Sequence, residues 1–269
     1  MLQRKLATAW SVINSQGIEA AAKVSFEKAA MWWRHGAPFE LGKLVGRPSS
    51  YARLDGCRFE LDSNVITPDL EYLLLSGKHE APERTLIRRH LNPALPVVEF
   101  GGAIGVVSCV ANALLDDRSK HVVIEANPAL LPVLQANRHR NNGQFAIEHG
   151  AIGYGSPVLR FPVAQDILES STFVATASTV DVPSTSLRAV LDAHGFEHCN
   201  LVCDIEGAEI NLVGQEASVL RQHVDVLIME VHERVVGQDV CDAMMRSLKS
   251  LGFELVERVC DTLAMRRVA

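Results

Sequence analysis

VVEFGGAIG, residues 97–105, is the stretch from which the fold can be read. Val97 and Val98 predict a buried parallel strand, and the apolar residues 104–115 predict a helix after it. The glycines therefore fall at a strand-to-helix junction. At such a junction the helix presents unpaired N–H groups and the positive end of its dipole, and glycine lets a ligand approach the backbone. The stretch predicts a ligand-binding site at the carboxyl end of the strand.

The glycine pattern also indicates the kind of ligand. A dinucleotide fingerprint, G-x-G-x-x-G, that ends on Gly102 and Gly105 would need its first glycine at Phe100. The tight turn that makes room for a pyrophosphate is therefore not encoded. Glu99, at the end of the strand, would repel a phosphate but could pair with an ammonium group. We expect a cationic ligand rather than a phosphorylated one.

A second acid closes the next predicted strand, residues 121–125. Glu125 lies 20 residues after Gly105, which is the separation expected for an acid that binds ribose hydroxyls. One acid for an amine and another for a ribose match S-adenosylmethionine, which also carries an adenine ring and a sulfonium. A third strand, near residues 145–148, leads to Ala151, and backbone groups there are candidates to contact the adenine.

The rest of the chain alternates in the same way. Two further strands, a helix and a closing hairpin are predicted at residues 200–204, 224–231, 239–251 and 253–267. Residues 154–186 break the alternation and predict a β-rich insertion. The expected fold is α/β: a Rossmann-like, mostly parallel seven-stranded sheet of the class I methyltransferase type, with helices on both faces.

The first 76 residues are predicted as a separate region. Residues 1–37 have the pattern of an amphipathic helical extension, which would pack on the main domain or a second subunit, or cover the pocket as a lid. Asp55-Gly56 predicts a hairpin. Residues 77–269 are predicted as the S-adenosylmethionine-binding methyltransferase domain.

Composition excludes some classes of protein. With 269 residues, 48% of them hydrophobic, the chain can bury a full α/β core. Its net charge of −6 argues against broad electrostatic attraction to nucleic acid. The six cysteines form no C-x-x-C pair and are expected to be reduced. The longest nearly apolar run, residues 103–115, is too short to span a bilayer, so we expect a cytoplasmic protein.

Several short motifs occur in a characteristic order. They are G-K-H-E at residues 77–80, E-F-G-G-A-I-G at 99–105, I-E-A-N-P at 124–128, D-I-E-G-A-E at 204–209 and M-E-V-H-E at 229–233. With these motifs the chain resembles the FkbM-type family of S-adenosylmethionine-dependent methyltransferases, over roughly residues 77–259. The family's usual G-A-N-x-G has Ala103 in place of the asparagine here, so the polar contact of that side chain is missing.

The resemblance assigns cofactor contacts by motif position. It implies that four residues surround the methionine part of the cofactor, namely Glu99, Gly101, Gly102 and Gly105. It implies that Glu125 holds the ribose, with Ala126 and Asn127 beside it. Glu80 is predicted either as a further cofactor contact or as a helix-end charge.

Methyl transfer to a hydroxyl needs an aligned donor and acceptor and a group that removes the hydroxyl proton. The carboxyl ends of the last two parallel strands offer Asp204, Glu206 and His232 as catalytic residues, with Glu230 and Glu233 nearby. His232 is the predicted base, because an imidazole accepts a proton near neutral pH. Asp204 and Glu206 could instead hold acceptor hydroxyls or a divalent metal, and the spacing leaves metal dependence open.

We therefore predict an S-adenosylmethionine-dependent O-methyltransferase that acts on a hydroxyl of a sugar, glycan or secondary metabolite. Two alternatives stay open. A nicotinamide-dependent oxidoreductase would bind a dinucleotide, and Phe100 counts against it. A non-catalytic binding protein of the same fold would bind the cofactor without transferring the methyl group, and Ala103 is the best support for it.

Overall fold

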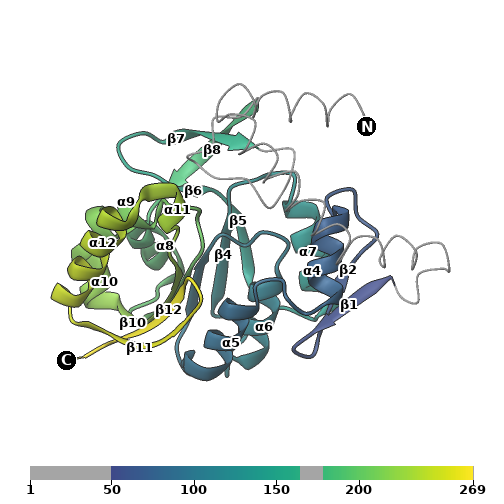
Figure 1. Cartoon of the computed structure of the whole chain (residues 1–269), viewed down its shortest axis with the longest axis horizontal. Helices are drawn as coiled ribbons and strands as arrows, with labels where there is room; N and C mark the ends of the chain where they lie inside the picture. The colour runs from purple at the N-terminus through teal and green to yellow at the C-terminus, as the bar shows by residue number, and fades with distance from the viewer. Residues whose placement is uncertain (1–49, 164–177, 269) are drawn as a thin grey trace, which may run out of the picture.

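The computed structural model describes residues 50–163 and 178–268 (Figure 1). The expected helical extension at residues 1–37 and a short strand-like run at 172–175 lie outside the described residues. The described chain forms a two-stranded, a seven-stranded and a three-stranded sheet.

The seven-stranded sheet is the centre of the molecule, in the order β11-β12-β10-β9-β3-β4-β5. Its strands are β3 (Val97–Phe100), β4 (His121–Glu125), β5 (Ala146–His149), β9 (Cys199–Cys203), β10 (Val224–Glu230), β11 (Phe253–Val259) and β12 (Thr262–Arg267). Neighbours from β10 to β5 pair in parallel, and β12 is antiparallel to both strands beside it. The predicted class I methyltransferase sheet, mostly parallel with a closing hairpin, is confirmed.

The strand order reverses between β3 and β9. From β3 the chain continues to β4 and β5 on one side, and it later returns to place β9 and β10 on the other. In an open parallel sheet such a reversal leaves a crevice beyond the carboxyl ends of the strands, where ligands bind. A ligand-binding site is therefore expected at the carboxyl ends of β3 and β9.

Helices cover both faces of this sheet (Figure 1). One face carries α5 (Ala81–His90), α6 (Val106–Leu114) and α7 (Leu131–Arg140), and the other carries α8 (Leu187–His194), α9 (Glu209–Gln215), α10 (Ala217–His223) and α12 (Gln238–Ser250). Successive side chains of a strand point to opposite faces. Val98 and Phe100 of β3 pack with α8, α9 and α12, whereas Val97 packs with α5 and α6.

The predicted hairpin at Asp55-Gly56 is confirmed. It joins β1 (Tyr51–Leu54) to β2 (Cys57–Glu60), and α4 (Pro68–Leu75) follows. Apolar side chains of all three elements share a core with α6 and α7. Asp55 also forms ion pairs with Arg84 and Arg88 of α5. The described part of the chain before residue 77 thus packs directly on the main sheet, and the division at residue 77 stays a prediction.

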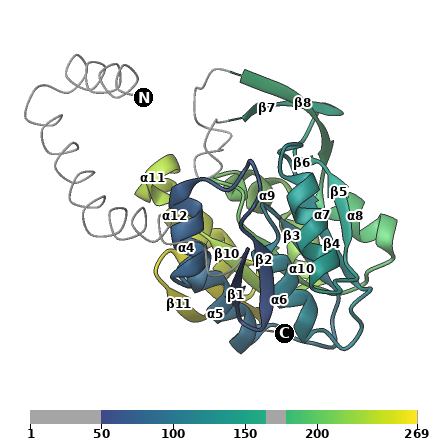
Figure 2. The same ribbon diagram turned by 90° about the vertical axis from the view of Figure 1, so that its right-hand side faces the viewer.

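The predicted β-rich insertion is present in the described residues. It consists of β6 (Ala151–Ile152), β7 (Val158–Val163) and β8 (Ser178–Thr185), in the order β6-β8-β7. Figure 2 shows β7 and β8 projecting beyond one end of the central sheet. Tyr154 ties this insertion to the body, because its hydroxyl donates a 2.6 Å hydrogen bond to Glu216.

Glu216 lies between two short helices in the segment that joins β9 to β10, where the apolar pattern of residues 210–220 predicts a single helix. These two helices are α9 and α10. The Glu216 carboxylate accepts the backbone N–H groups of Leu187 and Arg188, each at 2.7 Å, and so satisfies the start of α8. Glu216 thus connects the junction of α9 and α10 to the start of α8.

Two expectations from composition can be compared with the structure. All six cysteines are free, and Cys260 is exposed while the others are buried. In residues 50–163 and 178–268 no helix combines the length and apolar character needed to cross a bilayer.

Candidate functional site

A pocket lies at the carboxyl ends of β3, β4 and β9. The space inside it is about 750 Å³ when the open solvent at its mouth is counted. Its wall consists of Phe100, Gly101, Ala103, Ile124, Glu125, Ala126, Asn127, Leu130, Gly150, Ala151, Ile152, Phe161, Asp204, Ile205, Glu206 and Ala208. Seven of the predicted site residues are in this wall: Gly101, Glu125, Ala126, Asn127, Ala151, Asp204 and Glu206.

Gly101 brings two strand ends into contact. Its φ is +93°, and a Cβ at this position would lie 1.8 Å from the backbone oxygen of Asp204. Only glycine fits, both because of the left-handed backbone and because β9 ends so close. The turn after β3 and the end of β9 therefore form one continuous floor.

Gly102 and Gly105 were predicted to contact the cofactor, but neither is in the pocket wall. A Cβ on Gly102 would lie 2.4 Å from Val123 Cγ1, and one on Gly105 would lie 2.6 Å from Leu134 Cδ1. These glycines allow β4 and α7 to pack tightly against the turn. Their role in the structure is close packing behind the site.

Glu125 braces the glycine turn against the loop after β4. Its Oε2 accepts the N–H of Ala103 and its Oε1 accepts the N–H of Asn127, each at 2.6 Å. Burial raises the pKa of Glu125, and the two backbone N–H groups partly oppose that rise. Each carboxylate oxygen can accept a further hydrogen bond. The side chain is therefore fixed in place before a ligand arrives.

Ala103 adopts a backbone conformation that suits a different residue. Its φ is +43°, in the left-handed region that asparagine and glycine enter more readily than alanine. Asparagine, the usual residue at this position in the FkbM-type family that the sequence resembles, would fit that backbone conformation. Ala103 keeps the shape of the turn but supplies no amide to the pocket.

Glu99 requires a correction. Its side chain is not in the pocket wall, and the residue is only 1% exposed. One carboxylate oxygen accepts the Ser108 hydroxyl at 2.6 Å, and the other lies 3.0 Å from Nε2 of His121. Alternation along β3 explains the error, because Phe100 faces the pocket and its neighbour must face α6. The expected pairing of Glu99 with an ammonium group is wrong.

Glu80 lies at the start of α5, in a left-handed conformation with φ +48°. It is not in the pocket wall, and its buried Oε2 has no hydrogen-bond partner among the described residues. Burial, with the nearby carboxylates of Glu83 and Glu99, raises the pKa of Glu80 to about 8. A direct contact between Glu80 and a cofactor stays a prediction.

The predicted catalytic residues do come together. We call Asp204, Glu206, Glu209, Glu230 and His232 the carboxyl-end cluster, because they follow or end β9 and β10. His232 Nε2 lies 3.4 Å from Asp204 Oδ1 and 3.3 Å from Glu206 Oε2. Its Nδ1 lies 3.3 Å from Glu209 Oε1, which also accepts the Ile205 N–H at 2.8 Å.

The cluster perturbs the protonation of its own members. Burial raises the pKa of Asp204 and of Glu230, in the latter case to about 7. Burial alone would lower the pKa of His232, but the carboxylates of Glu209, Glu206 and Glu230 outweigh it and raise that pKa to about 9. In this environment His232 holds a proton at neutral pH, so the reason for expecting a base there does not hold.

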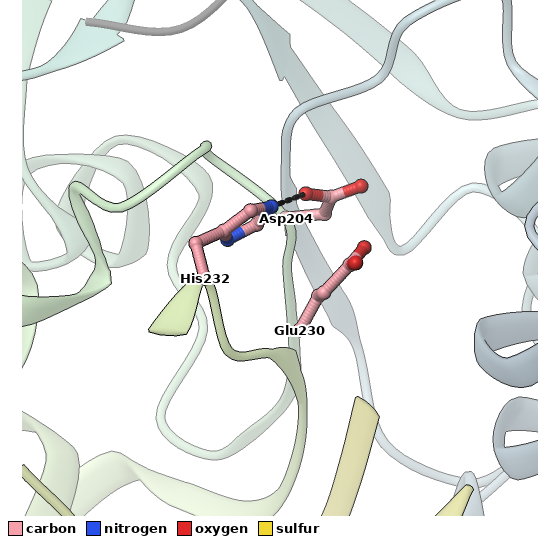
Figure 3. A group of neighbouring side chains, drawn as sticks. All are labelled: Asp204, Glu230 and His232. Atoms are coloured by element: carbon pink, nitrogen blue, oxygen red, sulfur yellow. Dashed lines mark ion pairs between the residues drawn. The ribbon is translucent and has the colours of Figure 1, made fainter. Parts of the chain in front are cut away.

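Sequence reasoning missed the apolar part of the wall. Phe100 could have been found, because strand alternation places it opposite Glu99. Phe161 could not, since it reaches the pocket from β7 through long-range packing of the insertion. Glu230 was noted only as a neighbour, but it completes the group that Figure 3 shows with Asp204 and His232.

The family model described as "Methyltransferase FkbM domain" matches residues 99–255. No curated protein sequence matches the chain significantly. Similar solved structures include a ribosomal protein L11 methylase from Lactobacillus delbrueckii subsp. bulgaricus, at 14% identity over 71% of this chain and 80% of that one, with a TM-score of 0.42. A precorrin-6y C5,15-methyltransferase from Geobacter metallireducens GS-15 is 13% identical over 77% of this chain and 91% of that one, with a TM-score of 0.42.

A methyltransferase from Pyrococcus furiosus is 9% identical over 89% of this chain and 95% of that one, with a TM-score of 0.43. The domain match rests on the sequence alone and covers more than half of the chain. It confirms the predicted family and the S-adenosylmethionine-binding fold, and both support methyl transfer. This protein belongs to the FkbM family of methyltransferases.

Proposed function

We propose that the protein transfers a methyl group from S-adenosylmethionine to a hydroxyl of a sugar, glycan or secondary metabolite. One observation carries this proposal: Asp204 and Glu206 of the carboxyl-end cluster are in the same pocket wall as Glu125 and the glycine turn. A cofactor held by Glu125 would therefore lie beside carboxylates that can hold an acceptor.

The cofactor would be placed by the parts of the pocket that are already fixed. The ribose hydroxyls would donate to Glu125, whose carboxylate is held by two backbone N–H groups. The methionine part would lie over the turn at Gly101. The apolar wall formed by Ala151, Ile152 and Phe161 suits the adenine ring.

The acidic end of the pocket suits both reactants. Carboxylates only accept hydrogen bonds when they are ionised, so they recognise hydroxyl groups, which can donate. They also favour a sulfonium cation by charge. The pyrophosphate of a nicotinamide cofactor would be repelled there. This acidic wall, rather than Glu99, supports the methyl donor over the dinucleotide.

Methyl transfer needs little chemistry from the protein beyond alignment. Bound S-adenosylmethionine would supply an electrophilic methyl group to the acceptor oxygen and would become S-adenosylhomocysteine. The hydroxyl proton passes to the carboxylate of Glu206, which is in the pocket wall. Asp204 and His232 would hold the acceptor in line, and such positioning can supply much of the rate acceleration.

Calorimetry with S-adenosylhomocysteine tests the proposal. The native protein should bind one equivalent, and Glu125→Gln should weaken binding by about tenfold or more, the equivalent of losing one charged hydrogen bond. Glutamine keeps the size of the side chain but only one acceptor oxygen, so it can accept the N–H of Ala103 or of Asn127 and not both, and circular dichroism checks that the variant folds. Glu148→Gln is the matched control, since that carboxylate lies on β5 outside the pocket wall.

Two results would contradict the proposal. The first is no binding by the native protein. The second is an equal loss in the Glu125 and Glu148 variants. Binding without methyl transfer to a panel of hydroxylated acceptors would instead support the non-catalytic alternative.

A further inference from the structure

We propose that Asp204, Glu230 and His232 form a binding site for one divalent metal cation. Figure 3 shows the three side chains pointing into a common space from the ends of β9 and β10. One potential ligand atom from each lies within 4.8 Å of the other two. Ligand atoms about 2.1 Å from an ion are at most about 4.2 Å apart, so small side-chain rotations would complete the site.

The ligand set has the chemistry of a cation that binds oxygen and imidazole. Two carboxylates and one imidazole suit Mg²⁺, Mn²⁺ or another first-row divalent ion. With three protein ligands, an octahedral ion keeps open positions for water or for an oxygen of an acceptor. Asp204 is also in the pocket wall, so those positions would face the pocket.

An unsatisfied polar atom in the cluster points independently to a missing partner. Asp204 Oδ1 is a buried atom that has no hydrogen-bond partner within the described residues. The side chain of His232 is 11% exposed, and its Nε2 is aimed at Asp204. Buried polar atoms in native proteins are nearly always paired, so an orphan of this kind calls for an unseen ion or water.

Charge leads to the same conclusion. The carboxyl-end cluster contains four carboxylates and one imidazole. Among the residues that the structure describes, no lysine or arginine forms an ion pair with Asp204 or Glu230. Even with a protonated histidine the group keeps an excess of negative charge when the acids are ionised. A bound divalent cation would neutralise that excess.

Glu209 acts as a positioning residue for this site. It is 1% exposed, and its Oε1 is fixed by the N–H of Ile205 and lies 3.3 Å from His232 Nδ1. A carboxylate beside one nitrogen of a metal-binding histidine holds the proton there and leaves the other nitrogen free for the metal. Here that leaves Nε2, on the side of Asp204, for the metal, and a cation that binds there displaces the proton that the imidazole otherwise carries on this nitrogen.

Binding of the cation does not depend on the cofactor. A role of the bound cation in holding the acceptor hydroxyl, by contrast, rests on the proposed function. The two claims therefore need separate measurements, one with metal alone and one with S-adenosylhomocysteine in the presence of EDTA.

Titration of the full chain with Mn²⁺ alone, followed by electron paramagnetic resonance, tests the site. One Mn²⁺ should bind per chain, and Glu230→Gln should weaken that binding by about tenfold or more. Glu233→Gln is the matched control, because it makes the same chemical change next to His232 on an exposed side chain. It should leave the affinity within about twofold of the native value.

A spectroscopic signature separates direct ligation from a general effect of charge. Nitrogen modulation of the Mn²⁺ signal in pulsed measurements should be present in the native protein and in Glu233→Gln and absent in His232→Gln. Circular dichroism checks that each variant folds. If one of these variants does not fold, Asp204→Asn is measured in its place.

Two results would overturn the site. The first is the absence of saturable Mn²⁺ binding at concentrations up to about 1 mM, the weak end of the range of protein sites for divalent cations. The second is equal Mn²⁺ affinity in the native protein, Glu230→Gln and Glu233→Gln. S-adenosylhomocysteine binding with no Mn²⁺ binding would remove the metal site and leave the proposed function standing. The reverse pattern would remove the proposed function and leave the metal site.

Discussion

The cofactor pocket and the carboxyl-end cluster lie on the same edge of one sheet, but their buried charges are satisfied in different ways. In the pocket, Glu125 has a backbone N–H group on each carboxylate oxygen. Burial raises the pKa of all three acids, but in the cluster Asp204 and Glu230 face other carboxylates, which raise their pKa values further. One site is therefore complete before its ligand binds, whereas the other would be completed by a cation.

The two regions are not independent, because Gly101 joins them. The turn after β3 touches the backbone of Asp204, the first residue of the cluster. A change at this contact should damage both regions, whereas a change on either side should affect one. Substitutions ranked by expected effect test this comparison.

Gly101→Ala should have the largest effect. The new Cβ would lie 1.8 Å from the Asp204 oxygen, so the strand ends must separate, and the left-handed backbone adds strain. We expect a loss of about 3 kcal/mol or more in the free energy of unfolding. Chemical denaturation measures it, with loss of S-adenosylhomocysteine binding as a second readout.

Gly155→Ala is the control for Gly101→Ala. Gly155 has φ +85°, but no atom lies within 4 Å of the point that a Cβ would occupy, so only the backbone strain applies. Its cost should be about 1 kcal/mol. Equal losses at the two glycines would show that β3 and β9 do not meet as described.

The effect of Glu80→Gln should depend on pH, from small at pH 5 to large at pH 8.5. The pKa of Glu80 is about 8 in the folded protein and near its ordinary value of 4.5 when unfolded, so the folded state binds the extra proton. The stability that this group contributes is complete below about pH 4.5 and is lost as pH rises through about 8. Glutamine cannot ionise, so the variant should exceed the native protein in stability by about 4 kcal/mol at pH 8.5, since a shift from 4.5 to about 8 is worth roughly 1.4 kcal/mol per pKa unit.

Thermal unfolding in EDTA at pH 5, 7 and 8.5 measures this difference. The two proteins should agree to within about 1 kcal/mol at pH 5, diverge steadily between about pH 5 and pH 8, and keep a nearly constant difference above that. A constant difference at all three values would mean that Glu80 does not hold its proton in the folded state.

Ala103→Asn should have the smallest effect. Asparagine tolerates the left-handed backbone better than alanine, so we expect a gain of about 0.5–1 kcal/mol in the free energy of unfolding. Ala103→Gly relieves the same strain without adding an amide. If only Ala103→Asn binds S-adenosylhomocysteine more tightly than the native protein, the improved binding comes from a polar contact of the amide. If both variants bind equally tightly, the improved binding comes from the relaxed backbone.

Local patterns predicted the architecture well. Apolar runs such as VVEF and HVVIE, each followed by a turn, place the parallel strands because buried strands need little tertiary context. The Asp55-Gly56 hairpin and the closing hairpin follow from turn chemistry and alternation. The role of Glu216 between α9 and α10 could not be read locally, since its carboxylate bonds to the start of α8, almost 30 residues earlier.

The site was predicted less completely. Position at a strand end correctly placed Glu125, Asp204 and Glu206 in one wall, because carboxyl ends of parallel strands share an edge. It misplaced Glu99, which has a buried serine and histidine as partners. Which face a strand-end acid points to depends on register, and the protonation of His232 depends on carboxylates from separate elements.

The central claim is that the pocket binds its cofactor independently of the carboxyl-end cluster. The most direct test is calorimetry with S-adenosylhomocysteine in the presence of EDTA, on the native protein and on Glu125→Gln and Glu230→Gln. We expect one bound equivalent for the native chain, affinity about tenfold or more weaker for Glu125→Gln, and affinity within about threefold of native for Glu230→Gln. No binding by the native chain, or equal losses in the two variants, would contradict this division.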